Sequence, residues 1–269
     1  MAKLRIKNNK HDPTVYHVGN RVVRQEFLFK EKDKEYFLEQ LDKLSKTYFV
    51  KIIEYKILDN HYHLVIEVYV PEDVDDEEIE KRFKNYYGDK RKYDSSQKEK
   101  LIERWGDLSK FMQDLQQRVA KEMNRRTEKK GHFWQGRFFS SILEGEEAIS
   151  SCLAYVALND VRAKIVTNPK EYAYGGIGEN KGKFKLIDKD TLTKYTSFKN
   201  YEDYVSFVMS ILIDERNRQK YLQRVPQITE SLVIGPKDFV RDEIVTKRLA
   251  IKHPRKLSRF FLNTSIYCY

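Results

Sequence analysis

The chain has 269 residues, of which 40% are hydrophobic, enough apolar material for one large domain or two small ones. Its aromatic content of 13% excludes a fully disordered chain, and no run of roughly 18 apolar residues suggests a membrane span. Its two cysteines exclude a disulfide framework and a metal site built from cysteine alone. With no apolar leader in its first residues, the sequence indicates a cytoplasmic protein that does not enter a membrane.

The charge balance gives the first indication of a partner. Lys and Arg number 51 against 41 Asp and Glu, so the net charge is +10. A positive balance of this size fits binding to a polyanion such as nucleic acid, because phosphates are neutralised by basic side chains. A basic surface that serves only solubility is equally compatible with the charge alone.

Periodicity predicts the elements of the first part of the chain. In chain order they are a basic N-terminal arm (1–13), a strand (15–23), a helix (30–48) and two strands (49–58 and 61–70). The last strand alternates most clearly, with Tyr62, Leu64, Ile66 and Val68 on one face and His61, His63, Val65 and Glu67 on the other. The apolar face is expected to pack under helices.

A break in composition follows this strand. Residues 71–107 are first acidic and then mostly basic, which favours an inserted loop with one short helix. Beyond it the sequence predicts a helix (108–126), a loop leading into a strand (131–143), a helix (144–166) and two further helices (200–224 and 238–253). Helices and strands in this order favour an α+β fold, with a ferredoxin/RRM-like antiparallel sheet, helices on one face, and a mainly helical C-terminal extension.

The pair His61 and His63 is the first candidate for chemistry. Residues two apart on a strand point to the same side, with their Cα atoms about 6–7 Å apart. Two neutral imidazoles at that spacing can bind one cation. A pair of histidines that binds no metal explains the same pattern.

The helix at 144–166 carries the second candidate. Its polar stripe holds Cys152, Tyr155, Asn159 and Arg162, and its apolar stripe holds Ile149, Leu153 and Val156. Tyr155 and Asn159 lie one turn apart, so a hydroxyl nucleophile stands beside an amide oxygen that could bind a metal. An ordinary amphipathic helix is the alternative explanation of this stripe.

Three segments together resemble a known family. They are YHVGNRVVRQEFLF, KIIEYKILDNHYHLVIEV and GHFWQGRFFSSILEGEEAISSCLAYVALNDVRAKIV. In this order they resemble the single-tyrosine HUH transposases, in particular the REP-associated tyrosine transposase branch. HUH stands for His–hydrophobic–His, which here is His61-Tyr62-His63, and the resemblance covers residues 14–70 and 108–174.

The resemblance implies roles for particular residues. It implies that His61, His63 and Asn159 hold a divalent cation, Mg²⁺ or Mn²⁺, and that Tyr155 is the nucleophile. It also implies a catalytic domain at 14–174 with an insertion at about 71–107, leaving 175–269 as an extension without a motif that can be carried over.

The sequence departs from the family pattern at two places where proline is usual. Asp160 follows Asn159, and Asp59 precedes the Asn-His pair. Neither position carries a catalytic group in the family. Asp160 is expected to add negative charge near the phosphate site.

The activity implied by the resemblance is cleavage and rejoining of single-stranded or hairpin DNA through a 5′-phosphotyrosine intermediate, by a monomer or a homodimer. Among the candidate DNA contacts, Arg137 and Trp134 lie in a basic segment with interleaved aromatics. His17 and Arg21 share a face of the first strand, from which they could approach phosphate, and Arg162 places a positive charge near Tyr155. Phe138 and Phe139, in the same segment as Arg137, are also explained by packing in the core.

Two other functions stay open at this stage. The first is a domesticated or otherwise non-catalytic nucleic-acid-binding protein on the same fold, although the RNP1 pattern of RRM domains is absent from the sequence. The second is a metal-dependent phosphodiesterase that uses water, which would release hydrolysis products and leave no DNA attached to the protein.

Overall fold

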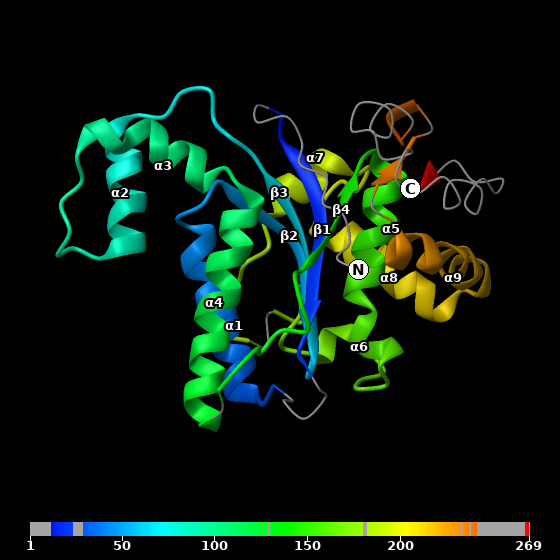
Figure 1. Cartoon of the computed structure of the whole chain (residues 1–269). Coiled ribbons are helices and arrows are strands. Elements are labelled where there is room, and N and C mark those ends of the chain that lie inside the picture. The colour runs from blue at the N-terminus through cyan, green and yellow to red at the C-terminus, as the bar shows by residue number, and fades with distance from the viewer. Residues whose placement is uncertain are drawn as a thin grey trace, which may run out of the picture.

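The computed structural model describes residues 12–23, 29–128, 130–179, 182–231, 233–236, 238–240 and 267–268 (Figure 1). Its elements in chain order are β1 (Thr14–Arg21), α1 (Glu31–Ser45), β2 (Val50–Ile57), β3 (His61–Val68), α2 (Asp76–Tyr87), η1 (Ser95–Gln97), α3 (Lys98–Trp105), α4 (Leu108–Thr127), β4 (Phe139–Leu143), α5 (Glu146–Ala157), α6 (Asn159–Arg162), η2 (Pro169–Glu171), α7 (Lys189–Tyr195), α8 (Tyr201–Ile213), α9 (Glu215–Glu230), β5 (Val233–Gly235) and β6 (Tyr267–Cys268).

Within the described residues, six strands form one sheet in the order β2-β3-β1-β4-β5-β6. β1 lies between β3 and β4 and is antiparallel to both, while β3 is also antiparallel to β2. The short strand β5 joins β4 in parallel. The order of the first four strands is that of the ferredoxin-like split βαβ unit. The α+β class expected from the sequence is therefore confirmed.

The helices α1 and α4 cover one face of the sheet (Figure 1). The alternation predicted for β3 holds, because Tyr62, Leu64, Ile66 and Val68 are buried in the same cluster as Phe37 and Leu41 of α1. Full burial of a large apolar side chain contributes about 1.5–3 kcal/mol each, so this layer supplies much of the stability of the fold.

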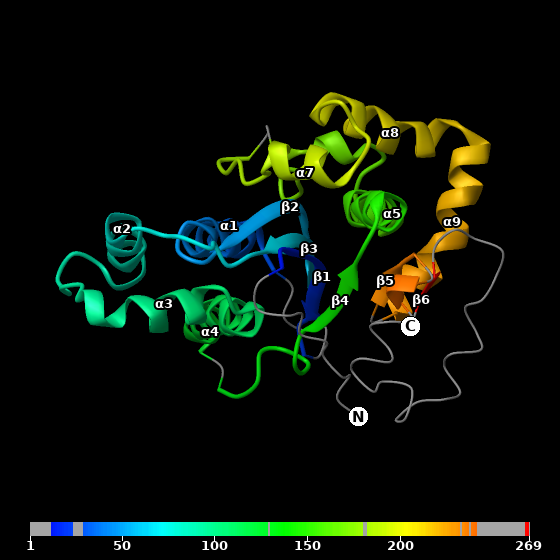
Figure 2. The same cartoon turned by 90° about the horizontal axis from the view of Figure 1, so that it is seen from above.

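The second face of the sheet is not open, which differs from the arrangement with helices on one face only. Figure 2 shows α5 on the side opposite α1 and α4. The apolar stripe of α5, which includes Ile149, Leu153 and Val156, is buried together with Val65 of β3 and Ile53 of β2. Because these strand residues are apolar, the second face also needs a cover. The C-terminal extension also packs into this cluster, with the buried side chains of α8 among its members.

Strand β2 contains a bulge at Ile53. The register with β3 shifts between Ile52 and Glu54, so Ile53 is an extra residue. Ile52 is buried under α1 and α4, whereas Ile53 is buried on the α5 side. Beyond the bulge, Lys56 stands opposite His63 and therefore shares its face.

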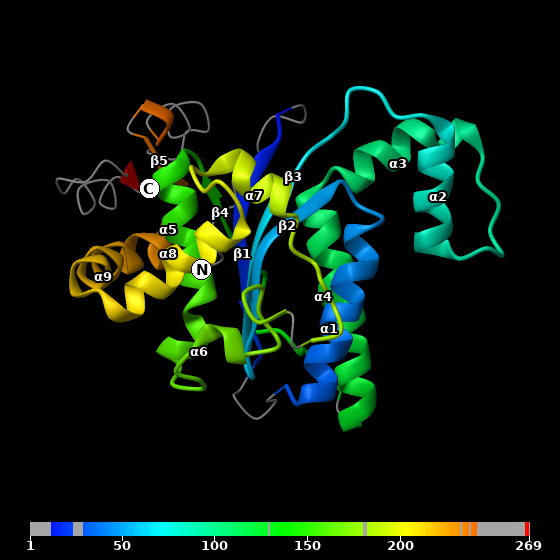
Figure 3. The same cartoon turned by 180° about the vertical axis from the view of Figure 1, so that it is seen from behind.

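The segment 71–107, expected to be an inserted loop, is more regular than the sequence suggested. Instead of one short helix it forms two, α2 and α3, with the turn η1 between them, and Figure 3 shows them on the far side of α4 from α5. Each helix buries apolar side chains, namely Ile79 and Phe83 from α2 and Leu101 and Trp105 from α3. These buried side chains pack against residues of α1 and α4, so α2 and α3 belong to the same hydrophobic cluster.

Two of the predicted helices are divided in the structure. The helix expected at 144–166 ends as α5 at Ala157 and resumes as α6 at Asn159, and the one expected at 200–224 is split into α8 and α9. The split between α8 and α9 falls at Asp214, whose side chain accepts a hydrogen bond from the backbone of Asn217 and so caps α9. The N-terminal arm up to residue 11 and most of the helix expected at 238–253 lie outside the described residues.

Gly19 of β1 should not tolerate a side chain. A Cβ atom there would meet the carbonyl oxygen of Tyr62 and the ring of Phe139, which packs across the glycine. We expect Gly19→Ala to lower the free energy of unfolding by about 1–3 kcal/mol in urea denaturation. Gly136→Ala, at a position with open space around it, serves as the control and should have little effect. Equal stabilities of the two variants would contradict this close approach.

Candidate functional site

The site is built on the face of the sheet that α5 covers. His61 and His63 project from β3, and their ring centroids lie 5.2 Å apart. Their neighbours in the register on β1 are Arg21 and Gly19. Because Gly19 has no side chain, the Phe139 ring of β4 can lie beside the His63 ring, at 5.8 Å between centroids.

The structure brings the two candidate motifs together. The ring of Tyr155, on α5, lies 5.4 Å from the ring of His63. Asn159, at the start of α6, places its Oδ1 atom 3.4 Å from Nε2 of His61. Phenol, amide and the imidazole pair therefore converge, although 92 residues separate His63 from Tyr155 along the chain (155 minus 63).

His17 of β1 is part of this cluster and is not a surface residue. Its Nε2 atom lies 2.9 Å from Nδ1 of His63, and the two rings stack at 5.1 Å between centroids. Burial lowers the pKa of His17 to about 3, so the ring is neutral at ordinary pH. We expected His17 to approach DNA phosphate, whereas the structure places it behind His63, where it can orient that ring.

His61 has an amide oxygen beside each ring nitrogen. Nδ1 lies 2.6 Å from Oδ1 of Asn60, and Nε2 lies 3.4 Å from Oδ1 of Asn159. Burial lowers the pKa of His61, which favours the neutral ring with one N–H. In the tautomer that donates through the shorter contact, to Asn60, Nε2 keeps its lone pair.

Burial also favours the neutral form of His63. Burial lowers the pKa of His63 well below its usual value, and the neighbouring rings of His17 and His61 add to the effect. When Nδ1 of His63 donates to Nε2 of His17, the Nε2 atom of His63 is left bare. Histidines that bind metals usually donate their second N–H in this way.

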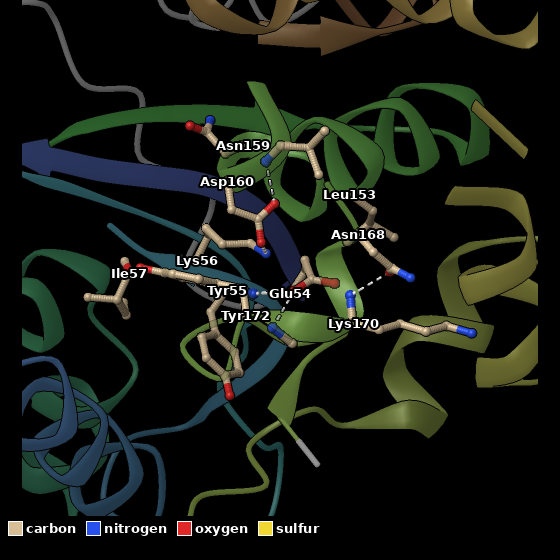
Figure 4. Close-up of polar contacts among 12 residues, drawn as sticks. Glu54, Tyr55, Lys56, Ile57, Leu153, Asn159, Asp160, Asn168, Lys170 and Tyr172 are labelled. Atoms are coloured by element: carbon tan, nitrogen blue, oxygen red, sulfur yellow. Dashed lines mark hydrogen bonds and ion pairs between the residues drawn. The ribbon is translucent and has the colours of Figure 1, made fainter. Parts of the chain in front are cut away.

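A buried ion pair holds α6 against the sheet. Nζ of Lys56 lies 2.5 Å from Oδ2 of Asp160, and both side chains are 0% exposed (Figure 4). Gly175 leaves room for the lysine, because a Cβ atom at that position would collide with the Lys56 side chain. We expected Asp160 to add negative charge near the phosphate site, but its charge is neutralised by Lys56 inside the protein. Since Asp160 follows Asn159 directly, the ion pair between Lys56 and Asp160 also fixes the position of Asn159 at the start of α6.

The negative charge of Asp59, the second departure from the family pattern, is also neutralised. Asp59 forms an ion pair with Lys34 of α1, with 2.5 Å between Oδ1 and Nζ. Asp59 thus ties the turn between β2 and β3 to α1, on the side of the sheet away from Tyr155.

The candidate DNA contacts divide into two groups. Arg162 and Arg21 are exposed and lie beside the site, since Arg162 stands 4.9 Å over the Tyr155 ring and Arg21 is paired with His61 in the sheet. Arg137 is also exposed. Trp134 is a core residue instead, because it is only 9% exposed, packs against Tyr62 under α1 and α4, and donates its indole N–H to the carbonyl of Gln116. A base cannot stack on a ring in that position.

Cys152 lies on the same helix as Tyr155 but outside the site. It is fully buried in the apolar cluster between α5 and the C-terminal helices. The polar stripe expected on this helix therefore begins only at Tyr155, whose own side chain is 6% exposed.

No family model matches the sequence, and no curated protein matches it. A solved structure of a REP-associated tyrosine transposase bound to a REP hairpin is similar to this chain, with a TM-score of 0.46 and 12% sequence identity. The similarity covers 68% of this chain and 87% of the other. A likeness at this level assigns no role to the residues of the site.

Among the described residues, none of the helices combines the length and the apolar character that crossing a bilayer requires.

Removing one partner of the Lys56–Asp160 pair should be costly. We expect Lys56→Met to lower the free energy of unfolding by about 3–5 kcal/mol, because it leaves a buried carboxylate without a counter-charge. The double variant Lys56→Met/Asp160→Leu should lose much less, since no buried charge remains. A double-mutant cycle by urea denaturation measures the difference. Lys84→Met, in the exposed pair with Glu80, is the control and should change stability little.

The neutral, buried His17 should make stability depend on pH. The unfolded chain takes up a proton at His17 below about pH 6.5, whereas the folded chain does not until about pH 3, so stability is lost as the pH falls. In a chelating buffer, His17→Gln should remove about 1 kcal/mol of the loss between about pH 6 and pH 5. His132→Gln, at an exposed position, should keep the pH dependence of the unchanged protein. If His17→Gln also keeps it, the ring is not held neutral.

Proposed function

We propose that this protein is a metal-dependent transposase or recombinase of the single-tyrosine HUH type. It cleaves and rejoins single-stranded, hairpin-flanked DNA through a 5′-phosphotyrosine intermediate. The observation that supports this most directly is the meeting of Tyr155 and Asn159 with His61 and His63 on one face of the sheet. A purely structural helix would not need a phenol and an amide turned toward a pair of imidazole rings.

In the cleavage step, the hydroxyl oxygen of Tyr155 attacks the phosphorus of the scissile phosphodiester. A bond forms between phosphorus and the tyrosine oxygen while the bond to the 3′ oxygen breaks. The proton that Tyr155 gives up is matched by the proton that the released 3′-OH gains. Because one phosphodiester replaces another, the 3′-OH of the same or another strand can reverse the attack without ATP.

The residues at the site fit a divalent cation. His61 and His63 would supply their Nε2 atoms and Asn159 its Oδ1 atom, which leaves positions open for a phosphate oxygen. In the part of the chain that the structure describes, no group of three or more His, Cys, Asp or Glu side chains is arranged for a metal, so the amide is needed to complete this set. Two nitrogen ligands favour Mn²⁺ over Mg²⁺, which prefers oxygen. The bound cation would polarise a non-bridging oxygen of the scissile phosphate.

The surroundings of the site suit a DNA strand. Arg162, over the Tyr155 ring, and Arg21, paired with His61 in the sheet, are exposed and can neutralise phosphates next to the scissile one. The overall charge of +10 favours the same partner. All the groups of the site come from one chain, so a monomer suffices for the chemistry, and a homodimer would not need to share residues between subunits.

Replacing Tyr155 by Phe should abolish covalent attachment to DNA. We expect the unchanged protein, incubated with labelled hairpin DNA and Mn²⁺, to form a conjugate that survives a denaturing gel. Tyr155→Phe should form none and still bind the hairpin, because only the attacking oxygen is lost. EDTA should abolish the conjugate of the unchanged protein.

The matched control is Tyr195→Phe, which removes a hydroxyl that hydrogen-bonds to Glu67 away from the histidine pair. It should keep the conjugate. A conjugate in Tyr155→Phe would show that another residue is the nucleophile. Hairpin binding without any conjugate in the unchanged protein would favour a non-catalytic DNA-binding protein, and cut DNA without a conjugate would favour hydrolysis by water.

A further inference from the structure

The C-terminal extension reaches the candidate site through α9. In Figure 1, α8 and α9 lie beyond α5 on the side away from the sheet. Arg224 of α9 forms an ion pair with Glu147 of α5 and donates a hydrogen bond of 2.9 Å to the Ser151 hydroxyl. These contacts fix the position of α9 along α5.

The contacts of Arg224 determine which residue of α9 comes near Tyr155. Tyr221 lies one turn before Arg224, and Tyr155 lies one turn after Ser151. Tyr221, which precedes Arg224, interacts electrostatically with Tyr155 and Arg162, which follow Ser151, so the two helices run in opposite directions at this contact. Tyr221 is therefore brought toward Tyr155, and both side chains belong to the same buried cluster.

The hydroxyl hydrogen of Tyr221 is buried without an acceptor. The residue is 8% exposed, and the neighbour of its oxygen is the Arg162 guanidinium, which can only donate, so no described residue accepts the hydroxyl hydrogen. Leaving a buried donor without an acceptor costs about 1–3 kcal/mol. An unpaired polar group in a native structure requires an explanation, and a ligand absent from the structure is one.

The charge around Tyr221 indicates what kind of ligand would pair with it. Burial raises the pKa of Tyr221 to about 12, and the nearby Arg162 guanidinium opposes that rise. The phenol is therefore protonated at neutral pH and can only donate to an anion. Arg162, which also stands over the Tyr155 ring, makes the neighbourhood favourable for a negatively charged group.

We propose that Tyr221 is a further catalytic residue of this site, donating its hydroxyl hydrogen to a non-bridging oxygen of the scissile phosphate. This rests on the function proposed above and extends it to the C-terminal third of the chain, which carries no recognisable motif. A hydrogen bond from a fixed, buried donor strengthens as charge builds up on the phosphate oxygens during attack. Tyr221 thus acts on the rate of strand cleavage more than on the affinity for DNA.

Tyr221→Phe in the full chain tests this inference. At saturating hairpin DNA and Mn²⁺, we expect the single-turnover rate of conjugate formation to fall by about 10²-fold, the size typical of one lost donor in an oxyanion site. The dissociation constant for the hairpin should change less than about threefold. The variant should unfold at nearly the same urea concentration, since the hydroxyl hydrogen that it removes has no acceptor.

The control is Tyr201→Phe, which removes a hydroxyl that donates to the carbonyl oxygen of Gly176. It should lower stability and leave the cleavage rate unchanged. This opposite pattern separates a catalytic hydroxyl from a structural one.

Three results would overturn the inference, and they are distinguishable. An unchanged rate in Tyr221→Phe, with the conjugate still on Tyr155, removes Tyr221 from the site and leaves the proposed function intact. A conjugate that persists in Tyr155→Phe and disappears in Tyr221→Phe makes Tyr221 the nucleophile instead. If the unchanged protein forms no conjugate at all, the proposed function fails and the role of Tyr221 fails with it.

Discussion

The buried ion pair between Lys56 and Asp160 is the constraint on which the geometry of the site depends. Taking two charges out of water is unfavourable unless they are close and well oriented, so the pair tolerates little movement of α6 relative to β2. Asn159 precedes Asp160 directly, so its position is fixed as well, with its amide facing His61. Buried ion pairs are often no more stabilising than apolar pairs of the same volume, so the contribution expected of this one is to position α6 rather than to stabilise the fold.

A large part of the fold follows from local patterns in the sequence. The alternation of Tyr62, Leu64, Ile66 and Val68 correctly predicts the face of β3 that lies under helices, because period two is imposed by the strand itself. The same reasoning correctly predicts that His61 and His63 share the opposite side. What periodicity does not reveal is that this side is covered as well, since α5 buries it with residues found far along the chain.

The contacts that sequence reasoning missed are all long-range. His17 was expected only to approach DNA, and its place behind His63 comes from a partner 46 residues away. Lys56 has no local signal either, because its partner Asp160 lies 104 residues further along the chain. Lys56 in a strand and Tyr221 in a helix look like ordinary surface choices until the fold buries them. Trp134 shows the converse error, since an aromatic residue in a basic segment suggested base stacking and the fold placed it in the core.

The extra residue in β2 has a consequence for tracing relatives of this chain. Ahead of Ile53, even-numbered positions face α1 and α4; after it, odd-numbered positions do, as Tyr55 and Ile57 illustrate. An alignment with a protein whose strand lacks the insertion must open a gap of one inside regular secondary structure, where gaps are ordinarily disfavoured. Without that gap, every later position of β2 is compared with a residue from the opposite layer, and Lys56 is matched to a side chain that performs a different task.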